Sequence, residues 1–66
     1  MASEFKVGDL VRTTCDMVDY YHDVHIPKGT AGVIVELAQY AGHVGEHLVS
    51  LPQGVIGIFE RALEKM

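Results

Sequence analysis

Histidine is the residue type in this sequence best suited to binding a metal ion, and its four copies form two pairs. One pair is His22 and His25, and the other is His43 and His47. Neutral imidazole is a ligand for zinc, copper and nickel. In a strand or loop, however, the His22–His25 spacing does not place both rings on one face. We therefore expect surface histidines in two loops and assign no metal ligand, with a metal site at these pairs as the alternative hypothesis.

Three tyrosines suit a ligand-binding surface, because the tyrosine ring combines a large apolar area with a hydroxyl group. Tyr20 and Tyr21 lie in a stretch rich in aspartate, and Tyr40 lies further along the chain. Such a surface would bind a small molecule or a protein segment, preferably a basic or proline-rich one. In the alternative interpretation, the rings cover the open end of the fold or lie at a subunit contact. The candidate ligand-binding residues are Tyr20, Tyr21, His22, His25 and Tyr40.

No combination of residues predicts a catalytic nucleophile. Cys15 is the only cysteine, and its neighbours Thr14 and Asp16 supply neither a base nor a positive charge, which a nucleophilic thiolate needs. Gly29 and Gly32 precede a predicted strand instead of a helix, so they indicate a turn and not a phosphate-binding loop. We predict no catalytic residue and no cofactor.

Length and composition predict a single domain, residues 1–66, that needs help to be stable. A chain of 66 residues buries only about 60% of its unfolded surface, yet 48% of its residues are hydrophobic. The net charge is −4, and the five basic residues are scattered, which disfavours nucleic-acid binding. No apolar run approaches the ~20 residues of a membrane span, and the start of the chain lacks the pattern of a signal peptide. With a single cysteine, these features predict a cytoplasmic protein that interacts with neither nucleic acid nor membrane.

The elements that must position these residues are short strands separated by glycine-containing turns. Residues 15–30 show no clean period and are expected to form a long surface loop, with one helical turn after Asp16 as an alternative. Residues 38–47 are expected to form a hairpin loop, with a short helix as the alternative. The last segment is compatible with a helix or with a strand after a 3₁₀ turn. The five expected strands are 10–14, 31–37, 47–51, 55–59 and 62–66.

Two turns and one strand have a more specific pattern. Gly8 and Asp9 predict a turn before the first strand, and Pro27 to Thr30 predict a β-turn before the second. Gly32 indicates a close approach of another segment or a bulge. The strand from Val55 to Phe59 is apolar on both faces. We expect one face in the core and the other against a second subunit, which predicts a homo-oligomer.

The order of these segments resembles the SH3-like small barrels. The resemblance extends from Phe5 to Met66 through KVGDLVRTT, IPKGTAGVIVEL, HLVSL, VIGIF and ALEKM. It implies an all-β, five-stranded SH3-like barrel with a long first loop and a 3₁₀ turn before the last strand. In such barrels the first loop often lines a ligand groove, which would place Tyr20 and Tyr21 beside it.

Three groups of SH3-like barrels share parts of this pattern. KOW-like domains resemble GTAGVIVEL but usually carry basic residues around it, where this chain has only Lys28. Small barrel proteins of unclear role share the G-D-x-V-R pattern. Type II dihydrofolate reductases are similar at FKVGDLVR and ALEKM, which implies an oligomeric enzyme with a symmetric pore. Their pore-lining glutamine and tyrosine align with Ile56 and Ile58, whose side chains cannot hydrogen-bond.

The sequence therefore predicts a non-enzymatic binding module that holds a protein or a small ligand with the segment 15–26 and Tyr40. The alternatives are an oligomeric enzyme of the type II dihydrofolate reductase kind and a metal-binding protein that uses the histidine pairs.

Overall fold

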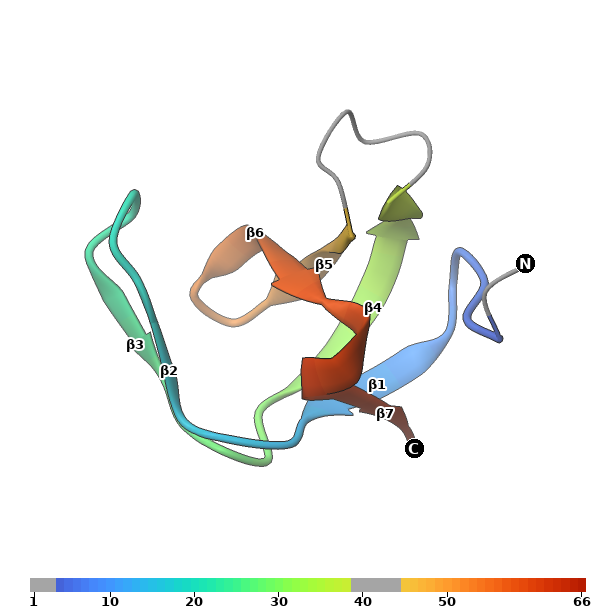
Figure 1. The fold of residues 1–66 in the computed structure, drawn as a ribbon, viewed down its shortest axis with the longest axis horizontal. Coiled ribbons are helices and arrows are strands. Elements are labelled where there is room, and N and C mark those ends of the chain that lie inside the picture. Colours follow the sequence, from blue (N-terminus) through green and yellow to red (C-terminus); the bar gives the residue numbers. More distant parts are fainter. Residues whose placement is uncertain (1–3, 39–44) are drawn as a thin grey trace.

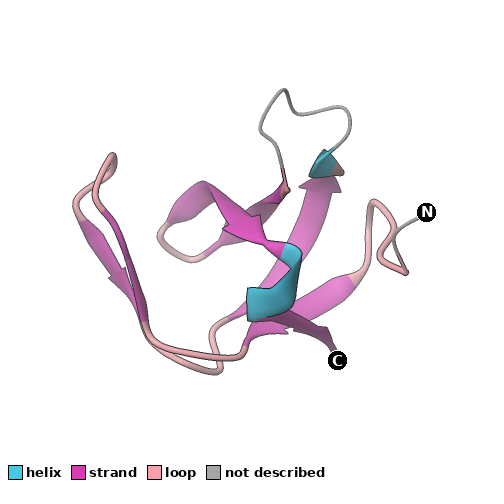
Figure 2. Cartoon of the chain, in the orientation of Figure 1, coloured by secondary structure: helices cyan, strands magenta, loops and turns pink. Residues whose placement is uncertain are grey.

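The computed structural model describes residues 4–38 and 45–66, and their regular structure is almost entirely antiparallel β-sheet (Figures 1 and 2). Five strands form one sheet in the order β6-β5-β4-β1-β7, and two strands form a separate hairpin. Within the described residues, no helix has the length and apolarity needed to cross a membrane. The strands are β1 (Leu10–Thr13), β2 (Met17–Asp19), β3 (Val24–Ile26), β4 (Ala31–Glu36), β5 (Glu46–Leu51), β6 (Gly54–Phe59) and β7 (Leu63–Lys65).

The main sheet is open, so the prediction of a closed five-stranded barrel is wrong. Strands β6 and β7 are its two edges, and among the described residues no strand pairing joins them. The physical reason lies in the first long connection. Strands β2 and β3 pair with each other and do not extend either edge of the main sheet. The hairpin that they form projects beside the main sheet (Figure 1).

The prediction of a long loop or a helical turn at 15–30 is also wrong, because this segment contains the β2–β3 hairpin. Met17 lies opposite Ile26, and Asp19 lies opposite Val24. At the tip, the Asp19 carboxylate accepts a hydrogen bond from the Tyr21 backbone N–H (3.3 Å). Asp23 takes a positive φ of 54°, a conformation that aspartate adopts more readily than most residues. Short-range bonds therefore close the tip of the hairpin.

The core lies between the main sheet and the base of the hairpin. Val11, Ile26, Ile34 and Val49 are completely buried, so the hairpin contributes through Ile26. Each side chain of this size contributes about 1.5–3 kcal/mol when it leaves water. The remaining buried apolar residues are Phe5, Leu51, Ile56, Ile58 and Leu63.

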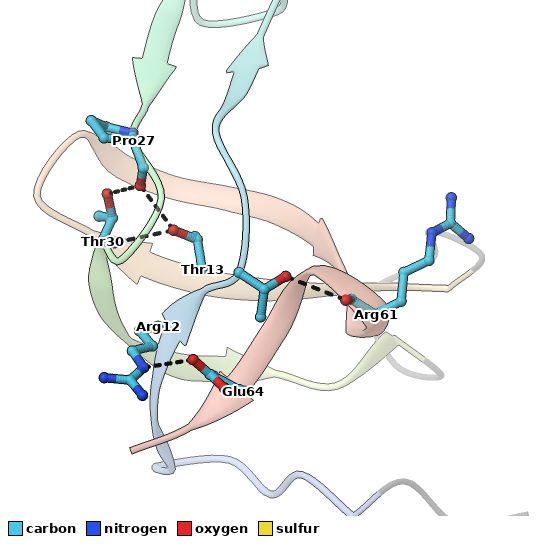
Figure 3. A network of polar contacts seen from close by, with 7 residues as sticks. Arg12, Thr13, Pro27, Thr30, Arg61 and Glu64 are labelled. Carbon is cyan, nitrogen blue, oxygen red and sulfur yellow. Dashed lines mark hydrogen bonds and ion pairs between the residues drawn. The ribbon is translucent and has the colours of Figure 1, made fainter.

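The side chains of the first strand alternate between the two faces of the sheet: Val11 and Thr13 are buried, and Leu10 and Arg12 are exposed. On the exposed face, the Arg12 guanidinium binds the Glu64 carboxylate of β7 at 2.7 Å (Figure 3). This contact links the first and last strands, which also pair through their backbones.

The predicted turn at Pro27 is confirmed, and several hydrogen bonds hold it in place (Figure 3). The Thr30 N–H donates to the Pro27 carbonyl (3.2 Å), and Gly29 has a φ of 86°. The Thr13 hydroxyl donates to the same carbonyl (2.9 Å) and accepts from the Thr30 N–H (3.0 Å). We call Thr13 together with residues 27–30 the corner.

Gly32 has the close neighbour that its position in a strand predicts. A Cβ atom there would lie 2.6 Å from Leu51 Cδ2 and 2.7 Å from the Ser50 carbonyl oxygen. The bulge that Gly32 could also have indicated does not lie at Gly32. The pairing of β4 with β5 shifts further along the strand, between Ile34 and Glu36. Gly32 therefore lets β4 and β5 pack closely at the end of the sheet next to the corner.

The chain after β6 turns once and returns to the sheet. A 3₁₀ helix, η1 (Glu60–Ala62), is followed directly by β7. This confirms the strand interpretation of the last segment over the helix. The Thr14 N–H donates to the Ala62 carbonyl (3.0 Å), so η1 is fixed beside the end of β1.

Candidate functional site

Two recesses of the described surface lie where the β2–β3 hairpin faces β5 and β6. The outer hollow has a volume of about 700 Å³, and the inner hollow one of about 500 Å³. Both volumes fall in the range of ligand-binding pockets. Asp19, Tyr21, Glu46 and Gly57 line both hollows. We call the two hollows together the groove.

The two hollows differ in the face of β6 that they use. The outer hollow is lined by Leu48 and Val55, whereas the inner hollow is lined by Ile56 and Ile58. Because side chains alternate along a strand, Val55 points away from the core that holds Ile56 and Ile58. The groove therefore passes around the open edge of β6, and Gly57 lies at the crossing point.

The wall opposite β6 comes from the hairpin and its tip. The side chains of Tyr20 and Tyr21 are 88% and 89% exposed. The Tyr21 ring meets the His22 ring edge-on, with 4.8 Å between the ring centres, and the His22 imidazole is bound to the Asp19 carboxylate. These contacts orient His22 and Tyr21 at the outer hollow while leaving most of the tyrosine surface in water.

The charged groups of the groove are mainly acidic. Asp19 and Glu46 contribute carboxylates from opposite walls. Arg61 lines the inner hollow, and its guanidinium lies 4.8 Å from the centre of the Phe59 ring. A guanidinium over an aromatic face is partly satisfied by that ring. The groove thus favours a ligand with a positively charged group.

His47 is buried at 3% exposure and has a fixed protonation pattern. Its Nδ1 accepts the Ala38 backbone N–H (2.9 Å), so Nδ1 carries no proton. Its Nε2 lies 2.7 Å from the Glu60 carboxylate and must donate to it. The ring is therefore neutral with the proton on Nε2, and it ties β5 to η1. Both nitrogens are occupied, so His47 is not positioned as a metal ligand.

The structure brings together only part of the predicted site. Tyr20, Tyr21 and His22 line the groove. His25 is exposed on β3 opposite Val18 and is not among the residues that line it. Tyr40 lies outside the described residues, as does His43. The prediction missed the residues that β5 and β6 contribute, chiefly Glu46, Leu48, Val55 and Gly57. The sequence offers one signal for these residues, which is Gly57 in the middle of the otherwise apolar strand from Val55 to Phe59.

The described residues bear on two of the alternatives, a metal site and a reductase-like pore. Residues 4–38 and 45–66 contain no group of three His, Cys, Asp or Glu side chains that could hold a metal ion. Ile56 and Ile58, which align with the pore residues of the type II reductases, are buried in the core of their own chain. Cys15 is exposed and lines the inner hollow.

We compared the chain with protein family models, with curated proteins and with solved structures, and none of the three comparisons found a match. The groove itself is therefore the basis for assigning a function.

Proposed function

We propose that this protein is a non-enzymatic binding module that holds a segment of another protein in the groove between the β2–β3 hairpin and β6. The observation that carries the proposal is that Asp19, Tyr21, Glu46 and Gly57 line both hollows, so the two hollows adjoin at β6. Adjoining hollows suit an extended segment better than a compact molecule, because an extended segment contacts both hollows at once.

The composition of the groove supports the same function. Tyr20 and Tyr21 present large rings to water at its rim, and exposed tyrosine is enriched at interfaces because it contributes area at a low entropic cost. The inner hollow adds apolar side chains such as Met17 and Ala62. A recess with an apolar floor and a few polar groups is typical of binding sites.

The arrangement of the strands supports a relation to SH3-like barrels as part of the proposal. The long connection after β1 and the 3₁₀ turn before β7 correspond to two parts expected of that fold, although the connection contains a hairpin where a loop was expected. The sheet remains open, so the relation concerns the order of the elements. In SH3-like domains the first long connection commonly borders a groove for a peptide, as the hairpin does here.

The test is a selection of displayed random twelve-residue peptides on the immobilised protein, followed by affinity measurements on two variants. Gly57→Val adds a side chain at the crossing point of the hollows, where a Cβ would approach Glu46 Oε1 to 3.0 Å. Ala31→Val adds the same side chain to an exposed position of β4 that pairs with Arg12 of β1 and lines neither hollow. We expect enriched peptides to lose at least tenfold in affinity for Gly57→Val and to keep it for Ala31→Val.

Two outcomes would contradict this function. One is the absence of any enriched peptide after repeated selection. The other is binding that the Gly57→Val protein retains in full, because such peptides would occupy another surface. Circular dichroism of both variants shows whether each keeps the β-sheet fold.

Self-association stays a prediction. Ile56 and Ile58 are buried within one chain, so the inward face of β6 cannot contact a second copy. The outward face of β6, where Val55 and Phe59 are exposed, can do so. Light scattering between micromolar and millimolar protein measures the solution mass. A mass equal to one chain throughout would remove the homo-oligomer.

A further inference from the structure

The backbone of β6 has one edge without a strand partner. β6 ends the main sheet, and β5 is its one neighbour among the described strands. Leu51 and Gly54 lie opposite each other across a two-residue turn, which makes them a hydrogen-bonded pair. Hydrogen-bonded and non-bonded pairs alternate along an antiparallel ladder. Val55 and Gly57 therefore direct their N–H and C=O groups away from β5, toward the groove.

The hollows lie where the side chains of one more strand would go. A strand added to the open edge continues the pleat, so its side chains point alternately to the two faces of the sheet. One face leads into the outer hollow, beside Leu48 and Val55. The other face leads into the inner hollow, beside Met17, Ile56 and Ala62. Two hollows on opposite faces of one edge are the geometry that strand addition uses for specificity.

The chemistry of the two hollows differs, and this defines the occupant. Among the described residues, those lining the outer hollow include the carboxylates of Asp19 and Glu46 but no lysine or arginine, and the Asp19 carboxylate is bound to the His22 imidazole. The inner hollow is floored by apolar side chains, with Arg61 at its end beside η1. An occupant with basic residues facing the first hollow and apolar residues facing the second is complementary to both.

We propose that the partner is an extended protein segment with alternating basic and apolar residues, which pairs with the backbone of Val55 and Gly57 as an additional strand of the main sheet. This assignment rests on the proposed function and specifies its partner. The segment places its basic side chains toward Asp19 and Glu46, and its apolar side chains enter the inner hollow.

The probe is a seven-residue peptide of alternating lysine and valine with blocked ends, compared with a peptide in which glutamate replaces lysine. Titration by nuclear magnetic resonance measures both affinities at low salt. We expect the lysine peptide to bind at least tenfold more tightly than the glutamate peptide. We also expect this preference to fall to about threefold or less in the double variant Asp19→Asn with Glu46→Gln. Equal binding of the two peptides overturns the charge assignment.

Backbone pairing is tested with two N-methylated forms of the lysine peptide. One is methylated on the backbone nitrogens of all lysines and the other on those of all valines. In an added strand, only alternate residues turn their N–H groups toward β6, so one form should lose binding and the other should keep it. Equal effects of the two methylations overturn strand addition.

Hydrogen exchange of the protein gives the matching readout on β6. The amides of Val55 and Gly57 should exchange faster than those of Ile56 and Ile58 in the free protein, and should slow at least tenfold when the lysine peptide is bound. A further outcome is that peptides from the random selection lose affinity for Gly57→Val and still leave the amides of Val55 and Gly57 unprotected. In that case the proposed binding function stands and strand addition fails. If the two amides are already protected in a concentration-dependent way without peptide, a second copy occupies the edge and the proposed partner is wrong.

Discussion

The corner and the groove use their polar groups in opposite ways. In the corner, the Thr13 hydroxyl both donates and accepts within the chain, and its side chain is 1% exposed. In the groove, Tyr20 and Tyr21 leave nearly all of their surface in water, and the outward backbone groups of β6 have no partner strand among the described residues. The corner therefore directs its polar groups into the chain, whereas the groove leaves much of its surface exposed.

Two strand glycines express the same difference. At Gly32, beside the corner, a Cβ would lie within 3 Å of backbone and packed side-chain atoms. At Gly57, in the groove, the nearest atom is Glu46 Oε1 at 3.0 Å, on a longer side chain. A Cβ at Gly32 would therefore meet packed backbone and side-chain atoms, whereas a Cβ at Gly57 would meet one flexible side chain.

The largest expected effect is on stability, from Gly32→Ala. The added methyl group must displace Leu51 and the Ser50 carbonyl, and overpacking of this kind costs about 3 kcal/mol. Urea unfolding followed by circular dichroism measures the loss. The matched variant is Gly57→Ala, for which we expect a loss below ~1 kcal/mol because the Glu46 side chain can move. Equal losses would remove the contrast between the two glycines.

The second effect is the loss of the corner's hydroxyl group in Thr13→Val. This change keeps the side-chain shape but removes one donor and one acceptor from a buried site, and we expect a loss of about 1.5 kcal/mol in the free energy of unfolding. Thr14→Val is the control, since the Thr14 hydroxyl makes a single long bond to the Arg61 carbonyl (3.5 Å). If Thr14→Val lowers the free energy of unfolding as much as Thr13→Val does, the hydrogen bonds of the corner contribute no more to stability than the single bond of Thr14.

The corner could be predicted from sequence because local rules determine it. Proline, glycine and threonine at the spacing of Pro27 to Thr30 favour a β-turn whatever lies around it, and the alternation of Val11 and Thr13 fixes which side chains face inward. The predicted strands from Ala31, from His47 and from Val55 coincide with β4, β5 and β6 to within a residue or two.

The hairpin and the groove could not be derived in this way. β2 and β3 contain three residues each, too few for a period to emerge, and tyrosines and an aspartate at the tip obscure the turn. Tyr20, Tyr21 and His22 were identified because aromatic and imidazole groups are conspicuous. Glu46 and Gly57 come from distant strands, and only the tertiary fold brings them opposite the hairpin.

A smaller effect on stability is expected at the buried His47, which links β5 to η1. Glu60→Ala removes the acceptor of the Nε2 proton, but the Glu60 side chain is 44% exposed, so water can replace it. We expect a loss of about 1 kcal/mol. The control is Glu64→Ala, which breaks a surface ion pair and should cost less than ~0.5 kcal/mol. Nitrogen chemical shifts should show the His47 proton on Nε2, and a proton on Nδ1 would contradict the assignment.

The smallest effect on stability should come from the double variant Tyr20→Ala with Tyr21→Ala. Because both rings are almost fully exposed, their removal should change the free energy of unfolding by less than ~0.5 kcal/mol. The affinity for peptides obtained by selection should nevertheless fall about tenfold. The comparison between corner and groove would fail if the tyrosine variant unfolded more easily than Thr13→Val.

The open edge of β6 also has a consequence for the protein at high concentration. An unpaired strand edge beside exposed Val55 and Phe59 is the kind of surface that recruits further copies into fibrils. Edge-to-edge stacking of two copies would bring their Asp19 and Glu46 carboxylates into the same crowded space, where like charges repel. We therefore expect the double variant Asp19→Asn with Glu46→Gln to be less soluble than the unmodified protein.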